Sequence, residues 1–315
     1  MKDNIIHKFN KNINNIHSLY NVKHALVALS GGSDSICLMK LLHNYNRLHI
    51  DYIYIDHQWS HDSYKHIEHL INQIKYYGLN IAIYQIKNIT YSETNTRKIR
   101  YKIILHHATK YKYQAIITGH NNTDKIETFI QQIIRGTSIN GATSLTFMNK
   151  IKKFFFRPLI HITKTDLIWL CRYFCLPIWS DYTNYNYSIQ RNRIRYELLP
   201  YLRNYLSHSI EKQIISFLTL SNIDNEYLKQ NTLKLYLTSH HKSYVALNHI
   251  FIQKQHISLQ TRILQLFFYH NFQIILKPKN IWYLISLIKN KLKNTQIVKY
   301  YNISIHITQY WLYIL

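Results

Sequence analysis

Cysteines, long apolar runs and a secretory signal are scarce or missing in this sequence. Its three cysteines among 315 residues are too few, and odd in number, for a disulfide framework, so we expect a reducing compartment. No apolar run reaches about 18 residues, the length that a membrane span requires. The first ten residues also lack the apolar stretch of a secretory signal. We therefore expect a globular protein that is neither exported nor membrane-spanning.

Acidic residues are the second shortage. The chain has 15 Asp and Glu against 39 Lys and Arg, a formal net charge of +24. After Glu226 there is no acidic residue at all, although Lys and Arg continue to the C-terminal region. This positive field favours a polyanionic partner, nucleic acid first and an anionic membrane surface second. The alternative is compositional drift, because the abundant Ile, Lys, Asn and Tyr are typical of an AT-biased genome.

Glycine is the third shortage. There are 6, where a usage of about 7% would give roughly 22. Gly31 and Gly32 are adjacent, and Gly119, Gly136 and Gly141 fall within one short stretch. In a chain so poor in glycine, these positions indicate tight backbone turns or the close approach of a ligand.

Strand and helix patterns alternate over the first 140 residues. They predict strands at 24–29, 48–56, 79–86 and 115–119, and helices from about residue 34, over 62–77, over 93–110 and over 123–136. This alternation predicts an α/β fold, a doubly wound parallel sheet with helices on both faces. Ligands of such sheets bind at the carboxyl ends of the strands, where SGGSDS, Asp56-His57 and Gly119-His120 all fall.

The chain changes character near residue 203. Pro200 ends a basic segment, residues 201–218 have helical periodicity, and no glycine occurs over 210–315. We predict a first domain over 1–203 and a smaller, mostly helical, basic domain over 204–315.

The segment Ser30-Gly31-Gly32-Ser33-Asp34-Ser35 joins the first strand to the first helix. Two glycines let backbone N–H groups turn toward an anion, the serines add donors, and the helix N-terminus adds its positive dipole end. The alternative is a capped turn, since Ser and Asp are good N-caps. The segment is not a Walker A loop, because G-x-x-x-x-G-K-[ST] is absent.

SGGSDS after HALVAL resembles the pyrophosphate loop (PP-loop) of the N-type ATP pyrophosphatases. The later motifs resemble one branch of them, the tRNA(Ile)-lysidine synthetases, in a short form lacking the last C-terminal domain. These motifs are YIDH at 54–57, E-x-x-x-R-x-x-R-Y at 93–101, GHNNTDKIET at 119–128, RG at 135–136, RPL at 157–159, and the stretch 179–200 with its R-N-x-I-R segment.

This resemblance implies a PP-loop fold of the adenine-nucleotide α-hydrolase type and a ligase activity. The family uses ATP and Mg²⁺ to adenylate the wobble cytidine of the CAU-anticodon isoleucine tRNA. Free L-lysine then displaces AMP to form lysidine. The resemblance further implies tRNA binding by 204–315, a homodimer as one assembly, and no membrane partner. The location would be a bacterial cytoplasm, with the plastid stroma as the alternative.

The resemblance also implies the residues of the ATP site. They are Ser30, Gly31, Gly32, Ser33, Asp34, Ser35, Asp56, His57 and His120. Asp34 is the predicted Mg²⁺ ligand, since hard cations prefer carboxylate oxygens, although its carboxylate is also a plausible N-cap. His120 fits a phosphate contact and equally a structural role at a strand end.

Two acids and one arginine are the further predicted catalytic groups. Asp124 and Glu127 are three residues apart and therefore share one helix face. We expect them to hold the ammonium of lysine or to assist its deprotonation; the alternative is a solvated acidic face. Arg100 and Arg97 lie one helical turn apart and present guanidinium groups to phosphates or to the flipped base, unless they are only a surface pair.

Six arginines and one asparagine are predicted to contact tRNA. They are Arg97, Arg100, Arg135, Arg191, Asn192, Arg193 and Arg195. The last four form the densest basic cluster of the chain, for which a solvated basic turn is the alternative.

Two positions depart from the family pattern. Thr123 stands where the family has the first of two adjacent aspartates, which puts a two-carboxylate site in doubt. Gln58-Trp59-Ser60 replaces G-L-R after the second strand, which weakens the adenine-side assignment there.

The spacings of cysteine and histidine residues suggest other functions, a tRNA thiolase or a metal site. Cys171 and Cys175 are four apart on a predicted helix, which favours core positions over the paired cysteines of a tRNA thiolase. His57 and His61 are also four apart, but we expect neither zinc nor an iron–sulfur cluster. A tRNA thiolase and a decayed RNA-binding protein remain the alternatives to a lysidine-forming ligase.

Overall fold

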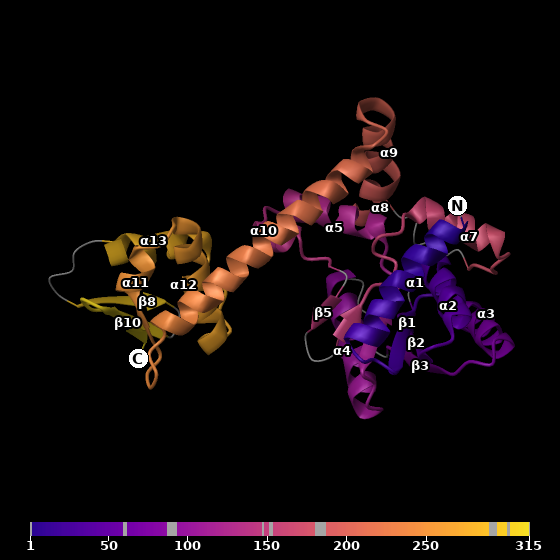
Figure 1. The fold of residues 1–315 in the computed structure, drawn as a ribbon, viewed down its shortest axis with the longest axis horizontal. Helices are drawn as coiled ribbons and strands as arrows, with labels where there is room; N and C mark the ends of the chain where they lie inside the picture. The colour runs from indigo at the N-terminus through magenta and orange to yellow at the C-terminus, as the bar shows by residue number, and fades with distance from the viewer. Residues whose placement is uncertain are drawn as a thin grey trace. The chain divides into compact units, whose positions relative to one another are not determined.

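A computed structural model describes residues 2–58, 62–86, 93–146, 148–150, 154–179, 187–289, 295–300 and 303–314. The chain divides into two compact units, Met1–Thr219 and Leu220–Leu315, and each is described by itself (Figure 1). The division falls inside a long helix, α10 (Ile210–Ser239), whereas the boundary predicted from sequence at residue 203 stays a prediction. No helix among the described residues is both long and apolar enough to cross a membrane.

A six-stranded sheet organises the first unit. Its order is β3-β2-β1-β4-β6-β5, with parallel pairing except between the last two strands. The strands are β1 (His24–Leu29), β2 (His49–Asp56), β3 (Ile81–Gln85), β4 (Ala115–Thr118), β5 (Met148–Lys150) and β6 (Phe154–Phe156). The doubly wound α/β fold predicted from the alternating pattern is confirmed, as are its four predicted strands.

Helices precede, connect and follow these strands. They are α1 (Lys2–Leu19), α2 (Ser33–Tyr45), α3 (Ser63–Tyr76), α4 (Glu93–Lys110), α5 (Asn122–Ile134), α6 (Ile139–Ala142), α7 (Lys164–Tyr173), α8 (Gln190–Arg193) and α9 (Leu199–Tyr201). Two π-helical turns, Ile194–Leu198 and Leu202–Leu206, flank α9. A continuous helix over 201–218 was predicted, and this is wrong. The backbone is extended at Ser207 and α10 begins only at Ile210.

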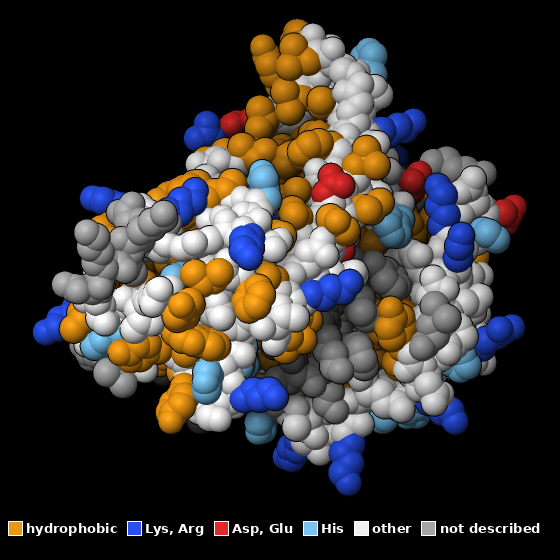
Figure 2. All heavy atoms as spheres, turned by 60° about the vertical axis from the view of Figure 1, so that its left-hand side comes forward, with side chains coloured by type: hydrophobic (Ala, Val, Ile, Leu, Met, Phe, Trp, Pro, Cys, Tyr) orange, Lys and Arg blue, Asp and Glu red, His pale blue; other side chains and the backbone are white. Residues whose placement is uncertain are grey.

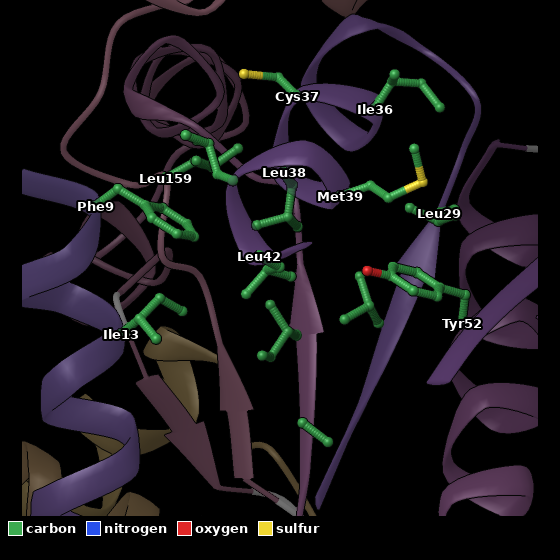
Figure 3. Packing of buried hydrophobic residues seen from close by; sticks show 14 of the residues in the cluster. Phe9, Ile13, Leu29, Ile36, Cys37, Leu38, Met39, Leu42, Tyr52 and Leu159 are labelled. Atoms are coloured by element: carbon green, nitrogen blue, oxygen red, sulfur yellow. The ribbon is translucent and has the colours of Figure 1, made fainter. Parts of the chain in front are cut away.

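Both faces of the sheet are buried, as successive side chains of a strand point to opposite sides. Val27 of β1 belongs to the larger core cluster with residues of α1, α2, α3 and α7. Figure 3 shows Phe9 and Ile13 of α1 beside Leu38 and Leu42 of α2 in that cluster. Leu26, the neighbour of Val27, belongs to a second cluster with residues of α4. The sheet is thereby fixed between two helical layers, and its carboxyl-end edge is left for the loops.

The second unit combines helices with a small sheet. Its helices are the C-terminal part of α10, α11 (His249–Gln253), α12 (Ile257–Phe272) and α13 (Pro278–Lys289). Its antiparallel sheet has the order β7-β10-β9-β8, formed by Ala246–Asn248, Trp311–Ile314, Ile303–Ile307 and Gln296–Tyr300. The predicted helices are present, but the sheet was missed because its strands are short and no glycine marks its turns.

Candidate active site at the carboxyl ends of the strands

The loop between β1 and α2 is shaped by Gly31. Its φ is +74°, in the left-handed region, and a Cβ there would lie 1.9 Å from Nε2 of His66. Glycine is therefore required both by the backbone conformation and by the space. Gly119, at the end of β4, packs against the backbone of Ser35, with a Cβ position 3.5 Å away. Of these two glycines, only Gly31 has a conformation and surroundings that disfavour a side chain, because a Cβ at Gly119 would make an ordinary van der Waals contact.

The loop carries its own hydrogen bonds. Gly32 is the N-cap of α2, and its carbonyl accepts from the Ser35 backbone N–H at 3.1 Å and from Ser35 Oγ at 2.9 Å. Ser30 Oγ donates to Ser35 Oγ at 3.2 Å. The first turn of α2 therefore starts at the carboxyl end of β1, the position where a helix N-terminus binds anions.

Asp34 is held by two other segments of the chain. Lys164 Nζ, at the start of α7, lies 2.7 Å from Asp34 Oδ1 and donates to Ser33 Oγ at 2.8 Å. Asn121 Nδ2 donates to Asp34 Oδ2 at 3.0 Å. Burial raises the pKa of Asp34 above its usual range despite the opposing charge of Lys164, and the negative charge of Asp124 adds to the rise. The positive charge of Lys164 therefore compensates the carboxylate of Asp34 only in part.

Asn121 links this carboxylate to the next one. It is the N-cap of α5, where its Oδ1 accepts from the Asp124 N–H at 3.0 Å, and Asp124 Oδ2 accepts from the Asn121 N–H at 2.9 Å. This reciprocal capping box fixes both side chains. Asn121 is fully buried. No role was predicted for Lys164, which lies in no motif, or for Asn121, which lies in the motif at 119–128 but is not one of its charged residues.

Two arginines neutralise the acids of α5. Arg191 lies 2.7 Å from both Asp124 Oδ1 and Glu127 Oε2. Arg195 lies 3.0 Å from Asp124 Oδ1 and 2.5 Å from Glu127 Oε1. Glu127 is fully buried, and each arginine side chain is 23% exposed. We call these four residues the arginine clamp.

The clamp sets the charge of its acids. Burial alone would raise the pKa of Asp124, but Arg191, His120 and Arg195 outweigh it, so that pKa is lowered. Asp124 and Glu127 do share one helix face, as their spacing predicts, but the face is buried and not a solvated acidic one. Their predicted role in binding lysine stays a prediction, and lysine would have to compete with two guanidinium groups.

The basic cluster of 191–195 is split by this arrangement. Arg193 is 64% exposed, and its one ion pair among the described residues is with Glu197, one turn away at 3.0 Å. Arg191 and Arg195 face inward to the clamp. Asn192 donates its backbone N–H to the Ile189 carbonyl. A single solvated basic turn is therefore not what forms here, and the tRNA contacts of the four residues stay predictions.

Two neutral histidines lie near Arg100. Burial lowers the pKa of His120 to about 3, and its Nδ1 lies 2.9 Å from Thr118 Oγ1. Burial, with Arg100 second, lowers the pKa of His57 to about 4. Both imidazoles are therefore uncharged at neutral pH, so they offer hydrogen bonds to a ligand without adding positive charge.

Asp56 is buried at the end of β2 and satisfied locally. Its Oδ1 accepts from the Gln58 N–H at 2.9 Å and from Ser63 Oγ, and its Oδ2 accepts from Gln85 Nε2 at 3.3 Å. Gln58 has a φ of 56°, in the region that favours the glycine of the family pattern. Asp56 thus shapes the turn, and its contact with ATP stays a prediction. Trp59, Ser60 and His61 lie outside the described residues.

Three arginines surround Tyr101 on α4. Arg97 and Arg100 lie 5.8 and 6.0 Å from its ring centroid, and Arg157 donates from Nη1 to the Thr146 carbonyl at 2.8 Å. Burial would raise the pKa of Tyr101, but Arg97, Arg157 and Arg100 together lower it. The buried Arg157 of the RPL motif thus joins the predicted pair Arg97 and Arg100. Arg135 is exposed at the C-cap of α5.

The cysteine prediction is half right. Cys171 is buried in the large core cluster, but α7 ends at Tyr173 and Cys175 is exposed. Cys175 has a φ of 47°, its N–H donates to the Arg172 carbonyl, and the next N–H donates to the Cys171 carbonyl. It therefore occupies the left-handed position of a Schellman cap, which ends the helix before the core face is reached again.

Comparisons with known proteins agree with this geometry. A family model described as a PP-loop domain matches residues 1–202. A chloroplastic tRNA(Ile)-lysidine synthase of Gracilaria tenuistipitata var. liui is 49% identical over 296 residues, covering 92% of each chain. The tRNA(Ile)-lysidine synthase of Nostoc sp. is 31% identical over 277 residues, covering 82% of this chain and 81% of the relative.

One solved structure is similar in fold. It is a U34-tRNA thiolase of Methanococcus maripaludis with its 4Fe-4S cluster, at a TM-score of 0.55 and 18% identity, covering 70% of this chain and 80% of that chain. At this identity the likeness shows the PP-loop fold alone.

Proposed function

Because the chain belongs to the tRNA(Ile)-lysidine synthase family, we propose that it is an ATP-dependent ligase that joins L-lysine to the wobble cytidine of the CAU-anticodon isoleucine tRNA. The C2 oxygen of the cytidine attacks the α-phosphorus of ATP, and pyrophosphate leaves. The ε-amine of lysine then attacks C2 and loses a proton, and AMP departs with the oxygen. The lysidine product makes the tRNA read AUA as isoleucine instead of AUG as methionine.

The observation that supports this function best is the loop at the carboxyl end of β1. Its glycine-dependent turn and the N-terminus of α2 suit the phosphates of ATP, and the serine hydroxyls add donors. His57 and His120, both neutral, suit hydrogen bonds to the nucleotide. We assign ATP binding to Ser30–Ser35 with these two histidines, and adenylate formation to the same site.

Asp34 suits a Mg²⁺ ion that accompanies ATP. Its partly buried carboxylate is harder to ionise than usual, as its raised pKa indicates, and its oxygens are the hard donors that Mg²⁺ prefers. A bound Mg²⁺ would supply charge neutralisation of the phosphates. Lys164, which contacts both Asp34 and Ser33, keeps the carboxylate paired before ATP arrives and is placed for a phosphate afterwards.

We assign a positioning role to the arginine clamp. Arg191 and Arg195 tie α5 to the segment 190–198 through two buried acids. The N-cap of α5 is Asn121, which holds Asp34. The clamp therefore acts on the loop through Asn121. Proton removal from the attacking amine by Asp124 or Glu127 requires that the ligand displace a guanidinium from these acids.

Binding of tRNA is assigned to the exposed basic residues. Arg193, Arg97 and Arg135 are exposed in the first unit, and the chain after Glu226 carries no acidic residue. On the face drawn in Figure 2, Lys, Arg and His side chains outnumber Asp and Glu. Cationic side chains of this kind bind phosphates through counterion release.

The cysteines separate this reaction from sulfur transfer. Cys37 and Cys171 pack in the core cluster, and Cys175 caps α7. Alanine at Cys171 and Cys175 is therefore expected to spare lysine transfer. The relatives cited are a chloroplastic and a bacterial enzyme, and we propose the plastid stroma, the location of the more similar of the two.

A direct assay tests the function. The full chain is incubated with ATP, Mg²⁺, radiolabelled lysine and unmodified CAU-anticodon isoleucine tRNA, with initiator methionine tRNA as the control. Label entering only the isoleucine tRNA is the expected result. Pyrophosphate release without lysine transfer would point to a different nucleophile. The absence of both from a folded, tRNA-binding protein would contradict the enzyme assignment.

A further inference from the structure

A second polar cluster lies at the amino-end edge of the sheet, away from the loop. His24 opens β1 and His49 opens β2, and these two residues are partners in the parallel register. Asp51 follows His49 by two residues, so it points to the same face of the sheet. Three potential metal ligands therefore meet on one face, although His24 and Asp51 are far apart in sequence. The loop lies at the other end of β1, roughly 16 Å away at about 3.3 Å per residue.

The ligand atoms of this cluster converge. His24 Nε2 lies 3.0 Å from Asp51 Oδ2, and His49 Nε2 lies 3.9 Å from the same oxygen. One ligand atom from each of the three residues lies within 4.8 Å of the other two. Zinc holds such ligand atoms at about 2.0–2.2 Å from the metal, and the His49 side chain, which is 71% exposed, has room to turn toward the other two ligands.

The carboxylate is fixed in place by neighbours that are not ligands. Tyr113 OH donates to Asp51 Oδ2 at 2.9 Å, and Asn80 Nδ2 donates to Asp51 Oδ1 at 3.3 Å. The Asp51 side chain is only 16% exposed. Supporting donors of this kind orient a metal-binding carboxylate and are as much a part of a metal site as its ligands. An incidental surface ion pair does not need them.

We propose that His24, His49 and Asp51 bind a divalent transition-metal ion of the zinc class. Two imidazoles and one carboxylate suit Zn²⁺ or Co²⁺ and not Mg²⁺ or Ca²⁺, which prefer oxygen donors alone. The ion takes the place of the hydrogen bond between His24 Nε2 and Asp51 Oδ2, and the neutral imidazole of His24 then carries its proton on Nδ1. Water completes the coordination. The ion ties β1 to β2 beyond their backbone ladder.

This site is independent of the proposed function. Sequence analysis missed it because His24 lies 25 residues before His49 and the spacing matches no metal motif. It also departs from the expectation that the chain binds no zinc.

Cobalt spectroscopy tests the proposal. The full chain, without an affinity tag and freed of metal by chelation, is titrated with Co²⁺ while visible absorption is followed. Saturation at one equivalent, and displacement by one equivalent of Zn²⁺, are expected. His49→Ala and Asp51→Asn should each remove the band and weaken Zn²⁺ binding at least tenfold. His208→Ala, an exposed histidine outside the cluster, is the matched control and should bind as the wild type does.

The lysine-transfer assay separates a folding defect from loss of the site. Because His49 is exposed and far from the loop, His49→Ala should keep its lysine transfer and circular dichroism. Equal Co²⁺ binding by His49→Ala, Asp51→Asn and the wild type would overturn the proposal. So would weak binding at many sites that His49→Ala does not reduce, since the chain has 20 histidines.

Discussion

Two aspartates in the candidate active site, both hydrogen-bonded to Asn121, have opposite electrostatic settings. Asp34 in the loop has one lysine as its partner, and its pKa is raised. Asp124 in the arginine clamp shares two arginines with Glu127, and its pKa is lowered. The negative charge of Asp34 is therefore incompletely compensated by its lysine, whereas that of Asp124 is compensated by its two arginines. The same residue type therefore supports ligand binding at Asp34, whose side chain is 20% exposed, and structure at Asp124, whose side chain is 9% exposed.

The difference gives a physical criterion for function. A buried acid whose charge is fully offset by guanidinium groups stabilises the fold only while both partners remain. A buried acid that stays under-compensated costs stability, and it is retained where a ligand supplies the missing charge. By this criterion Asp34 takes part in the reaction, and the arginine clamp holds the active site in place.

Removing one clamp acid should have the largest effect on stability. Glu127→Gln leaves two guanidinium groups with one carboxylate in a fully buried position. We expect the free energy of unfolding of the first unit to fall by roughly 3–5 kcal/mol. Urea unfolding followed by circular dichroism measures it. An unchanged midpoint would show that the clamp does not support the fold.

Removing the loop acid should lower activity without lowering stability. Asp34→Asn keeps the size of the side chain but cannot supply the carboxylate charge, so pyrophosphate release should fall by on the order of 10²–10³-fold. The unfolding midpoint should equal or exceed that of the wild type, because a carboxyl with a raised pKa destabilises the folded state at neutral pH. Binding of tRNA to Asp34→Asn should persist. Normal turnover in this variant would remove Asp34 from the reaction.

The two aspartates should also differ in the pH dependence of stability. Asp124 has a lowered pKa, so its stabilisation is full above the unfolded value of about 3.9 and is lost as the pH falls through the folded pKa. Asp34 has a raised pKa, so its cost grows as the pH rises from about 3.9 through the folded pKa. As the pH rises through that range, Asp34→Asn should become more stable relative to the wild type. Asp124→Asn should be less stable than the wild type at neutral pH, and this difference should disappear at low pH. Urea midpoints at several pH values measure both. Parallel curves would contradict the assigned signs.

The smallest effect is expected for the exposed arginine of the basic cluster. Arg193→Ala removes only a surface pair with Glu197, so stability should change by less than about 1 kcal/mol. If Arg193 contacts a phosphate, the salt dependence of tRNA binding should lose a slope of about 1. Arg191→Ala is the matched comparison and should chiefly lower stability. An unchanged salt slope in Arg193→Ala would remove this residue from the interface.

The sequence was sufficient for the parallel sheet and the loop, because buried strands, alternating helices and paired glycines are local signals. It was not sufficient for the partners of Asp34. Lys164 and Asn121 reach that carboxylate from 130 and 87 residues away, and no local pattern records the meeting. That Arg191 and Arg195 point inward could not be predicted for the same reason. Their spacing in the sequence is the same in a buried cluster of ion pairs and in a solvated turn. The second sheet was missed because its strands are three to five residues long.

Carboxyl titration tests the contrast between the two regions most directly. The chain is labelled with ¹³C at the aspartate carboxyl carbon, and the Asp34 and Asp124 signals are assigned with Asp34→Asn and Asp124→Asn. We predict that Asp34 titrates above the usual aspartate range and Asp124 below it. Adding ATP with Mg²⁺ should move the Asp34 titration downward and leave that of Asp124 in place. The reverse order, or two ordinary titrations that ATP and Mg²⁺ do not move, would contradict the account.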